Sequence, residues 1–417
     1  MQRSRNVLAA SLAALLVAAC ATTASHAPSA SSGMSSARLQ ALTSKIRDDV
    51  ARGEYPGAVL VVVRDGKTVL AEAFGAQDPA TGTPMRPDSV FRIASMTKPV
   101  VSVAVLALVE DGKIGLGDPV SRYIPEFKGL KVGVERKDAS GATALEEVTA
   151  DREMTVQDLL RHTAGLTYGI FGDSLVDRRY REAKLMGPPG PTSDEFIRRL
   201  AALPLAQQPG KSWQYSRATD VLGVLVERVS GKPLDAFLSE RILAPLGMSS
   251  SGFFVQASEQ GRVAQPFAID PDTKAPTKVG DMRTRPAFLS GGGGMVSTAG
   301  DYARFARMLL EGGTLDGVRI LSRKSVELMT SDALPPGAAM PWPGDGFGLG
   351  VAVRISRGLP PAPGSVGAFG WAGIHGTSFT VDPAERLVAV WMVQRASFPA
   401  AMASWARYRA MLYAAVE

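Results

Sequence analysis

A serine and a lysine three residues apart, Ser95 and Lys98, stand at the front of an apolar run in the stretch FRIASMTKPVVSVAVLALVEDG. On a helix, residues at this spacing share one face with Cβ atoms about 5–6 Å apart. The amine could then take the proton of the hydroxyl and make it a nucleophile. A helix N-terminus also favours negative charge, as an alkoxide or oxyanion would carry. Because about one Ser-x-x-Lys is expected by chance in a chain this long, the spacing alone is a hypothesis.

Lys98 is useful as a base only if its pKa lies below the ordinary value of about 10.4. The apolar residues after it predict burial, and burial disfavours the charged ammonium. We therefore expect a buried Lys98 with a depressed pKa. The alternative on spacing alone is a serine that caps a helix, followed by a first-turn lysine.

A Ser-His-Asp triad is poorly supported by this sequence. The pattern Gly-x-Ser-x-Gly, which marks a nucleophile elbow, does not occur, and the chain has 3 histidines. His26 lies in a polar N-terminal stretch, and His162 in LLRHTAGL is interpreted as a packed structural histidine. His375, between glycines in GWAGIHGTSF, fits a wall of a site as well as it fits a structural role. No metal-ligand spacing and no phosphate loop occurs, so neither metal nor cofactor is expected.

The composition is that of a globular protein: 417 residues, 45% hydrophobic, with a formal charge of +6. This length allows one large domain or two intimate ones. The basic residues are dispersed, which favours a solvated surface over a nucleic-acid-binding one. No pattern indicates an oligomeric state.

The first 20 residues are typical of a secretory signal. Arg3 and Arg5 precede an apolar segment, 7–19, that is short for a membrane span. The segment ends in Val-Ala-Ala-Cys, which resembles the bacterial lipoprotein box, so Cys20 is expected to carry a lipid. The alternative is an ordinary signal peptide cleaved a few residues later.

Residues 21–36 are rich in Ala, Ser and Thr and are interpreted as a flexible tether. Cys20 is the chain's single cysteine, so no disulfide is expected. Ala21 rather than Asp after the cysteine favours the outer membrane. The expected location is therefore the periplasm, with a lipid anchor in the outer membrane.

Strand-like segments occur near both ends of residues 37–417, with helical patterns between them. Two β-runs in GAVLVVVRDGKTVLAEAFG are joined by Asp65-Gly66, a hairpin signal. Further segments are predicted as follows: helices from 37, from 95 to 111, in TVQDLLRHTAGL with Thr155 and Asp158 as a capping box, at 217–229, 298–311 and 399–416, and strands at 347–356, 376–382 and 386–394. This order predicts an α+β fold, in which one antiparallel sheet is built from both chain ends and flanked by helices. A mostly helical lobe, about 113–290, is inserted, and a cleft beside the sheet would hold the site.

Six segments together resemble the serine beta-lactamase-related superfamily, which includes class C beta-lactamases and D-alanyl-D-alanine peptidases. They are FRIASMTKP, LLRHTAGLTYG, PGKSWQYSRATDVLGVLVERVSGKPL, ILAPLGM, GGGGMVSTAGDYARFARMLLEGG and GWAGIHGTSFTVDP. The match covers about residues 38–415 in order, and within the superfamily the chain is most similar to the family VIII carboxylesterases. The resemblance implies the beta-lactamase/transpeptidase-like fold and a serine hydrolase that works through an acyl-enzyme.

The resemblance also implies roles for individual residues. Ser95 would be the acylated nucleophile, with Lys98 as its base or proton relay. Tyr215, in Tyr-Ser-Arg, falls where the family places a tyrosine that shuttles a proton to and from the leaving group. An unperturbed phenol has a pKa near 10, so Tyr215 needs Lys98 nearby and the pair would titrate as a unit.

The third family motif falls at Trp371-Ala372-Gly373, on a strand beside the site. The oxyanion hole would consist of the backbone N–H groups of Ser95 and Ile374. Trp371, Gly373 and His375 are accordingly expected to line the substrate site, together with Arg217 of the second motif.

Two positions depart from the beta-lactamase pattern. Trp371 stands where beta-lactamases have a lysine that recognises a carboxylate, and Arg217 stands where they have an asparagine. Arg217 could bind a carboxylate itself in bidentate fashion, or it could face solvent. A neutral, bulky Trp371 suits small neutral esters better.

The sequence thus predicts a serine esterase on small carboxylic esters. One alternative is a class C-like beta-lactamase, or a peptidase or amidase on D-amino-acid cell-wall fragments. Another is a penicillin-binding sensor without turnover, although the joint presence of Ser95, Lys98 and Tyr215 argues against it.

Overall fold

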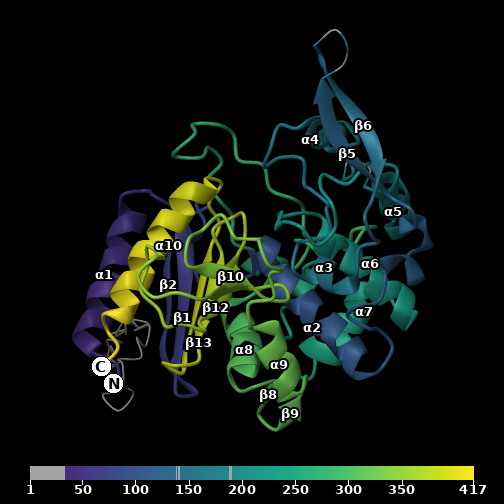
Figure 1. The fold of residues 1–417 in the computed structure, drawn as a ribbon. Helices are drawn as coiled ribbons and strands as arrows, with labels where there is room; N and C mark the ends of the chain where they lie inside the picture. Colours follow the sequence, from purple (N-terminus) through teal and green to yellow (C-terminus); the bar gives the residue numbers. More distant parts are fainter. Residues whose placement is uncertain (1–32, 138, 140, 187–189) are drawn as a thin grey trace, which may run out of the picture.

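The computed structural model describes residues 33–417 apart from 138, 140 and 187–189. Its central element is an antiparallel sheet with the strand order β10-β11-β12-β13-β14-β1-β2-β3. The strands are β1 (Gly57–Arg64), β2 (Lys67–Asp78), β3 (Thr83–Pro84), β10 (Asp345–Phe347), β11 (Ala352–Arg354), β12 (Phe369–Ala372), β13 (Ser378–Asp382) and β14 (Leu387–Val393). Strands from both chain ends meet where β1 pairs with β14, which confirms the predicted α+β fold and sheet (Figure 1).

Strand β1 lies in the middle of the sheet and is buried on both faces, which explains its unbroken apolar sequence. Side chains alternate along a strand, so Val59, Val61 and Val63 join the larger core while Leu60 and Val62 join the smaller one. The predicted hairpin turn is confirmed at Asp65-Gly66, where both residues have positive φ (48° and 73°).

Two helix layers cover the sheet. Helix α1 (Ser36–Ala51) packs with α10 (Phe398–Tyr413) on one face, and α8 (Ala299–Leu310) contacts β1, β13 and β14 on the other (Figure 1). The remaining helices are α2 (Thr97–Glu110), α3 (Val156–Leu160), α4 (Leu175–Glu182), α5 (Ser193–Ala201), α6 (Ala218–Ser230), α7 (Leu234–Leu238) and α9 (Arg323–Met329). The capping box of Thr155 and Asp158 begins α3 as predicted.

The lobe between the sheet halves contains α3 to α7 and also a β-hairpin that the sequence analysis missed. Strands β5 (Lys131–Lys137) and β6 (Thr143–Thr149) pair along their whole length and project from the lobe (Figure 1). Other short pairs are β4 (Phe91–Arg92) with β7 (Val296–Ser297), and β8 (Thr314–Leu315) with β9 (Val318–Arg319).

The predicted strand 347–356 is wrong as a single element, since β10 and β11 are separate strands joined around Gly350. A Cβ at Gly350 would lie 2.1 Å from Ser102 Oγ of α2, and its φ is +93°. The chain therefore turns at Gly350, where its backbone passes close to α2. Strand β12 contains Trp371 and Ala372, which the resemblance had placed on a strand beside the site.

Residues 33–36 belong to the folded part, so the predicted tether cannot extend to residue 36. Met34 is buried and forms a β-bridge with Val416, and Ser35 N–H donates to Ala415 O at 2.8 Å. The predicted signal at 1–20, with Cys20, lies outside the described residues. Within the described part, no helix is both long and apolar enough to cross a bilayer.

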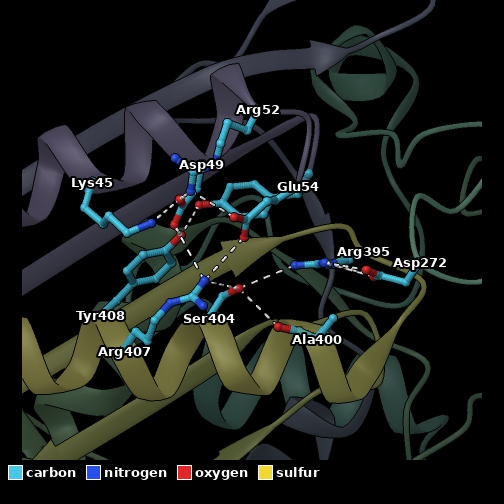
Figure 2. A network of polar contacts seen from close by, with 11 residues as sticks. Lys45, Asp49, Arg52, Glu54, Asp272, Arg395, Ala400, Ser404, Arg407 and Tyr408 are labelled. Atoms are coloured by element: carbon cyan, nitrogen blue, oxygen red, sulfur yellow. Dashed lines mark hydrogen bonds and ion pairs between the residues drawn. The ribbon is translucent and has the colours of Figure 1, made fainter.

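Helices α1 and α10 are joined by a polar network around Asp49, shown in Figure 2. The Asp49 carboxylate is buried, pairs with Lys45 and Arg52, and accepts a hydrogen bond from the Tyr408 hydroxyl at 2.5 Å. The hydroxyl groups of Tyr408 and Tyr55 are also 2.5 Å apart. The network therefore ties both helices to the chain that enters β1.

Candidate active site

Ser95 lies in a single 3-10 turn, Ala94–Met96, between β4 and α2, and is partly accessible. Ala94 has φ +45°, a conformation that costs a non-glycine residue about 1–3 kcal/mol and persists only where its surroundings enforce it. Thr97 enforces it by donating to Ala94 O at 2.7 Å and accepting from Met295 N–H at 3.1 Å. The turn that presents Ser95 is thus held in a strained, defined shape ahead of a buried helix.

Lys98 is fully buried and its ammonium points back to Ser95. Its Nζ donates to Ser95 Oγ at 3.2 Å and to Gly292 O at 2.6 Å. It also lies 4.6 Å from the ring centroid of Tyr215. The structure therefore brings together Ser95, Lys98 and Tyr215, which the sequence analysis had grouped.

The expected depression of the Lys98 pKa is wrong in direction. Burial alone would lower it, but the adjacent Tyr168 and Tyr215, with Asp220 further away, raise the pKa of Lys98 above its ordinary value. Lys98 is therefore a fixed positive charge at neutral pH, directed at the Ser95 hydroxyl.

The glycine run 291–294 holds the second acceptor of Lys98. A Cβ at Gly291 would lie 2.5 Å from Thr219 O, so glycine is required for this approach to α6. Gly292 N–H donates to the buried Asp220 carboxylate at 3.0 Å, while its carbonyl accepts from Lys98. Asp220 and Gly292 thus position the lysine, a role that the sequence analysis missed.

Tyr215 precedes α6 and receives a hydrogen bond from β12, an inner strand of the sheet. Trp371 Nε1 on β12 donates to the Tyr215 hydroxyl oxygen at 3.3 Å, and the two rings are 5.4 Å apart. An indole N–H can only donate, so it favours a Tyr215 oxygen that carries negative charge. Trp371 therefore contacts the hydroxyl group of Tyr215 directly.

Arg217, the other departure from the beta-lactamase pattern, already has a partner. Its Nη1 is 3.4 Å from the Asp220 carboxylate, and its guanidinium lies 4.7 Å from the centroid of the Tyr168 ring. Arg217 is thus partly buried, and one edge of its guanidinium is directed at Asp220.

The turn between β12 and β13 lies against the strand that leads to Ser95. A Cβ at Gly373 would be 2.4 Å from Ile93 O, and the Thr377 hydroxyl donates to the same carbonyl at 3.1 Å. Neither Ser95 N–H nor Ile374 N–H has a backbone acceptor in the described part of the chain. Two N–H groups are thus free on segments that contact each other, as an oxyanion hole requires.

Neither His162 nor His375 forms a hydrogen bond with the Ser95 hydroxyl, whose partner in the described residues is Lys98. His162 is buried, its Nδ1 is 3.2 Å from Ser216 Oγ, and burial, reinforced by Lys98, keeps its pKa well below the ordinary value. Its ring packs behind Tyr215 at 4.9 Å. Burial beside Arg92 lowers the pKa of His375 to about 4, and its backbone carbonyl accepts from Arg395 N–H at 2.9 Å. Both rings are therefore neutral at physiological pH.

Sequence reasoning also missed Tyr168, although it lies within a quoted segment, LLRHTAGLTYG. Its ring centroid is 5.5 Å from Lys98 Nζ and 5.3 Å from the Tyr215 ring. Burial raises the pKa of Tyr168 to about 12 despite the nearby Lys98. Burial thus opposes ionisation of Tyr168, whereas the ammonium of Lys98 favours it.

Taken together, these groups can support nucleophilic attack on an acyl carbon. The hydroxyl of Ser95 has a buried cation, a hydrogen-bonded phenol and free N–H donors close by. Among the described residues, no group of three or more His, Cys, Asp or Glu side chains is arranged to bind a metal ion.

Known proteins share both the sequence and this architecture. The Beta-lactamase family model matches residues 42–414. Protein Rv1367c of Mycobacterium tuberculosis (strain ATCC 25618 / H37Rv) is 41% identical over 84% of this chain and 88% of its own length. Esterase EstB of Burkholderia gladioli is 34% identical over 87% of this chain and 92% of its own. The solved structure of EstCE1, described as a hydrolase with promiscuous acyltransferase activity, is 26% identical with a TM-score of 0.75 and covers 90% of this chain and 98% of that one. The chain therefore belongs to the beta-lactamase family, as its motifs had indicated.

Proposed function

We propose that this member of the beta-lactamase family is a serine carboxylesterase acting on small neutral esters. Ser95 Oγ attacks the ester carbonyl, and the N–H groups of Ser95 and Ile374 stabilise the oxyanion. The alcohol leaves, an acyl-enzyme remains on Ser95, and water then releases the acid.

Proton transfer in this mechanism belongs to Lys98 and Tyr215 together. The ammonium of Lys98 stays charged and stabilises an anionic oxygen on either Ser95 or Tyr215. The indole N–H of Trp371 supports the same charge on Tyr215. As the phenolate, Tyr215 can thus accept the serine proton, and as the phenol it can return that proton to the leaving alcohol oxygen.

The contact between Trp371 and Tyr215 is the observation that favours an ester over a lactam. A hydrogen-bond donor is supplied there by a neutral side chain, and Arg217, the nearby cation, is paired with Asp220. A substrate carboxylate would therefore meet a neutral side chain at Trp371 and, at Arg217, a cation that is shared with Asp220. The similarity to an esterase, EstB, supports the same choice.

The test is hydrolysis of p-nitrophenyl butyrate and of a chromogenic cephalosporin by the purified protein and by Ser95→Ala. We expect ester cleavage that is lost in Ser95→Ala, with little cephalosporin turnover. The reverse preference would overturn the proposal in favour of a beta-lactamase or a cell-wall peptidase. Labelling by a fluorescent penicillin without turnover of either substrate would instead indicate a binding protein.

We also propose that Cys20 carries a lipid that anchors the protein to the outer membrane, with the folded part in the periplasm. The lipoprotein-like box at residues 17–20 supports this. Cys20→Ala should move the protein from the membrane fraction to the soluble fraction, and unchanged membrane association would refute the anchor.

A further inference from the structure

Exposed apolar side chains gather beside Tyr215 on two loops from different parts of the chain. Phe171, in the loop before α4, is 61% exposed, and Trp342, in the loop before β10, is 47% exposed. Ile170 and Ile374 are exposed as well. Exposed apolar groups that are contiguous with a reactive site are typical of ligand-binding surfaces.

Ring contacts connect these two exposed residues through the candidate site. Phe171 lies 5.8 Å from the Tyr215 ring, Tyr215 lies 5.4 Å from Trp371, and Trp371 lies 6.0 Å from Trp342. We call Phe171, Tyr215, Trp371 and Trp342 the aromatic strip. It runs from solvent at one end, past the proton-handling phenol, to solvent at the other.

The loop that carries Phe171 is held in place by Arg181 of α4. The guanidinium donates to Gly169 O, to Gly172 O at 3.1 Å and to the Asp173 carboxylate at 2.8 Å. Three bonds from one side chain thus fix both flanks of Phe171. Its exposure is built into the loop, and a rigid aromatic side chain binds at a low entropic cost.

The opposite end of the strip is also supported by packing. Trp342 contacts Trp213 at 6.1 Å, and Trp213 is stacked on Tyr215 at 6.0 Å with an interplanar angle of 15°. Trp342 therefore rests on two rings of the site, Trp213 and Trp371, while almost half of it remains open to solvent.

We propose that the aromatic strip binds the alcohol half of the ester, and that this half is an aromatic or similarly broad apolar group. The inference rests on the proposed function, because Tyr215 protonates the leaving alcohol oxygen in that mechanism. A substituent on that oxygen lies next to Tyr215 and extends along Phe171 or Trp342. At the Phe171 end of the strip, the charged neighbours Asp173 and Arg181 are paired with each other, so this end favours an uncharged alcohol.

The experiment compares 2-naphthyl acetate with ethyl acetate, which share an acyl group and differ in the alcohol. Phe171→Ala and Trp342→Ala should each lower kcat/KM for the naphthyl ester by about 3- to 10-fold, mainly through KM, since each removes one aromatic contact. Values for ethyl acetate should stay within about 2-fold, and Phe171→Leu should lie between wild type and Phe171→Ala. Leu328→Ala is the matched control, because Leu328 on α9 is 42% exposed but lies outside the strip.

Binding of 2-naphthol to Ser95→Ala, followed by tryptophan fluorescence, separates the two proposals. Saturable binding that weakens in Ser95→Ala/Phe171→Ala would support the strip even if neither ester is hydrolysed. Equal losses for both esters, or no loss for the naphthyl ester, would overturn it. A dimer that dissociates in Phe171→Ala, with unchanged kinetics, would also overturn it, because the strip would then be a contact between two copies of this chain.

Discussion

Two of the buried charged side chains, Asp49 and Lys98, differ in what surrounds their charge. Asp49, between α1 and α10, is surrounded by opposite charges on Lys45 and Arg52 and by the Tyr408 hydroxyl (Figure 2). Lys98 donates hydrogen bonds to the Ser95 hydroxyl and the Gly292 carbonyl, and in the described structure no carboxylate lies within ion-pair distance of its ammonium. Both side chains are fully buried.

In both places the surroundings favour the charged form. Burial by itself would raise the pKa of Asp49, but hydrogen bonds from Lys45 and Tyr408 lower it, just as neighbouring groups raise the pKa of Lys98. The charge of Asp49 is neutralised within the helix pair. The charge of Lys98 remains available to an oxygen that reacts, which is why a buried charge among neutral partners indicates a functional site.

Replacing Lys98 should produce the largest change. Lys98→Met removes the charge and keeps an apolar chain of similar length, so we expect turnover to fall by about 10²–10⁴-fold. Stability should be unchanged or should rise, since replacing a buried ion by an apolar group is often neutral or stabilising by about 1–4 kcal/mol. Ester hydrolysis and urea unfolding measure the two effects. Lys45→Met is the control, because it removes a lysine from the Asp49 network instead of from the candidate active site. Wild-type turnover in Lys98→Met would contradict a functional role for the buried charge of Lys98.

Replacing Asp49 should lower stability and leave turnover unchanged, the reverse of the result expected for Lys98. Asp49→Asn removes the charge from the helix pair and leaves the Tyr408 hydroxyl with a weaker acceptor, at a cost of about 1–3 kcal/mol in the free energy of unfolding. The kcat and KM values at 25 °C should match wild type, because Asp49 lies in the α1–α10 layer. A loss of activity without a loss of stability would show that the two regions are coupled.

The contribution of Asp49 to the free energy of unfolding should also depend on pH. Its pKa is lower in the folded protein than in the unfolded chain, so its contribution is present above the unfolded value of about 3.9 and is lost as pH falls through the folded value. The difference in unfolding free energy between wild type and Asp49→Asn should therefore be largest at pH 7 and shrink below about pH 4. Urea titrations at pH 7, 5 and 3.5 measure it, and a constant difference would mean that the carboxylate charge is not involved.

Arg407 at the rim of the same network should matter least. It lies 3.8 Å from the Asp49 carboxylate and its side chain is 51% exposed. Exposed ion pairs contribute about 0–1 kcal/mol, so Arg407→Ala should lower stability by less than about 1 kcal/mol and leave activity unchanged. A larger loss would mean that the network is held from its solvent side.

The sequence predicted what depends on local pattern: the β-runs at both ends, the Asp65-Gly66 turn and the helix after Ser95. Its six motifs also identified the family. Lys98 was predicted to be buried, but the direction of its pKa shift depends on Tyr168, which only the fold brings beside it.

Most of the features that the sequence analysis missed depend on contacts between residues that are distant in sequence. Asp220 and Gly292 are far apart in sequence and act together through one contact. The strands β5 and β6 show little alternation of apolar and polar residues, so their sequence gives a weak strand signal. They are joined across the hairpin by ion pairs such as Arg136 with Glu146. Phe171 and Trp342 lie in loops whose sequences give no sign that both end beside Tyr215.

The pairing of β1 with β14 places a constraint on how the chain can be made. β1 emerges from the ribosome long before its partner on one side, β14, because the whole lobe lies between them in the sequence. Until then Gly57–Arg64, an apolar β-forming segment, has an unpaired edge of the kind that promotes association with other chains. The sheet can close only after synthesis of β14, so folding of this protein is expected to be slow, late and dependent on protection of its first strand.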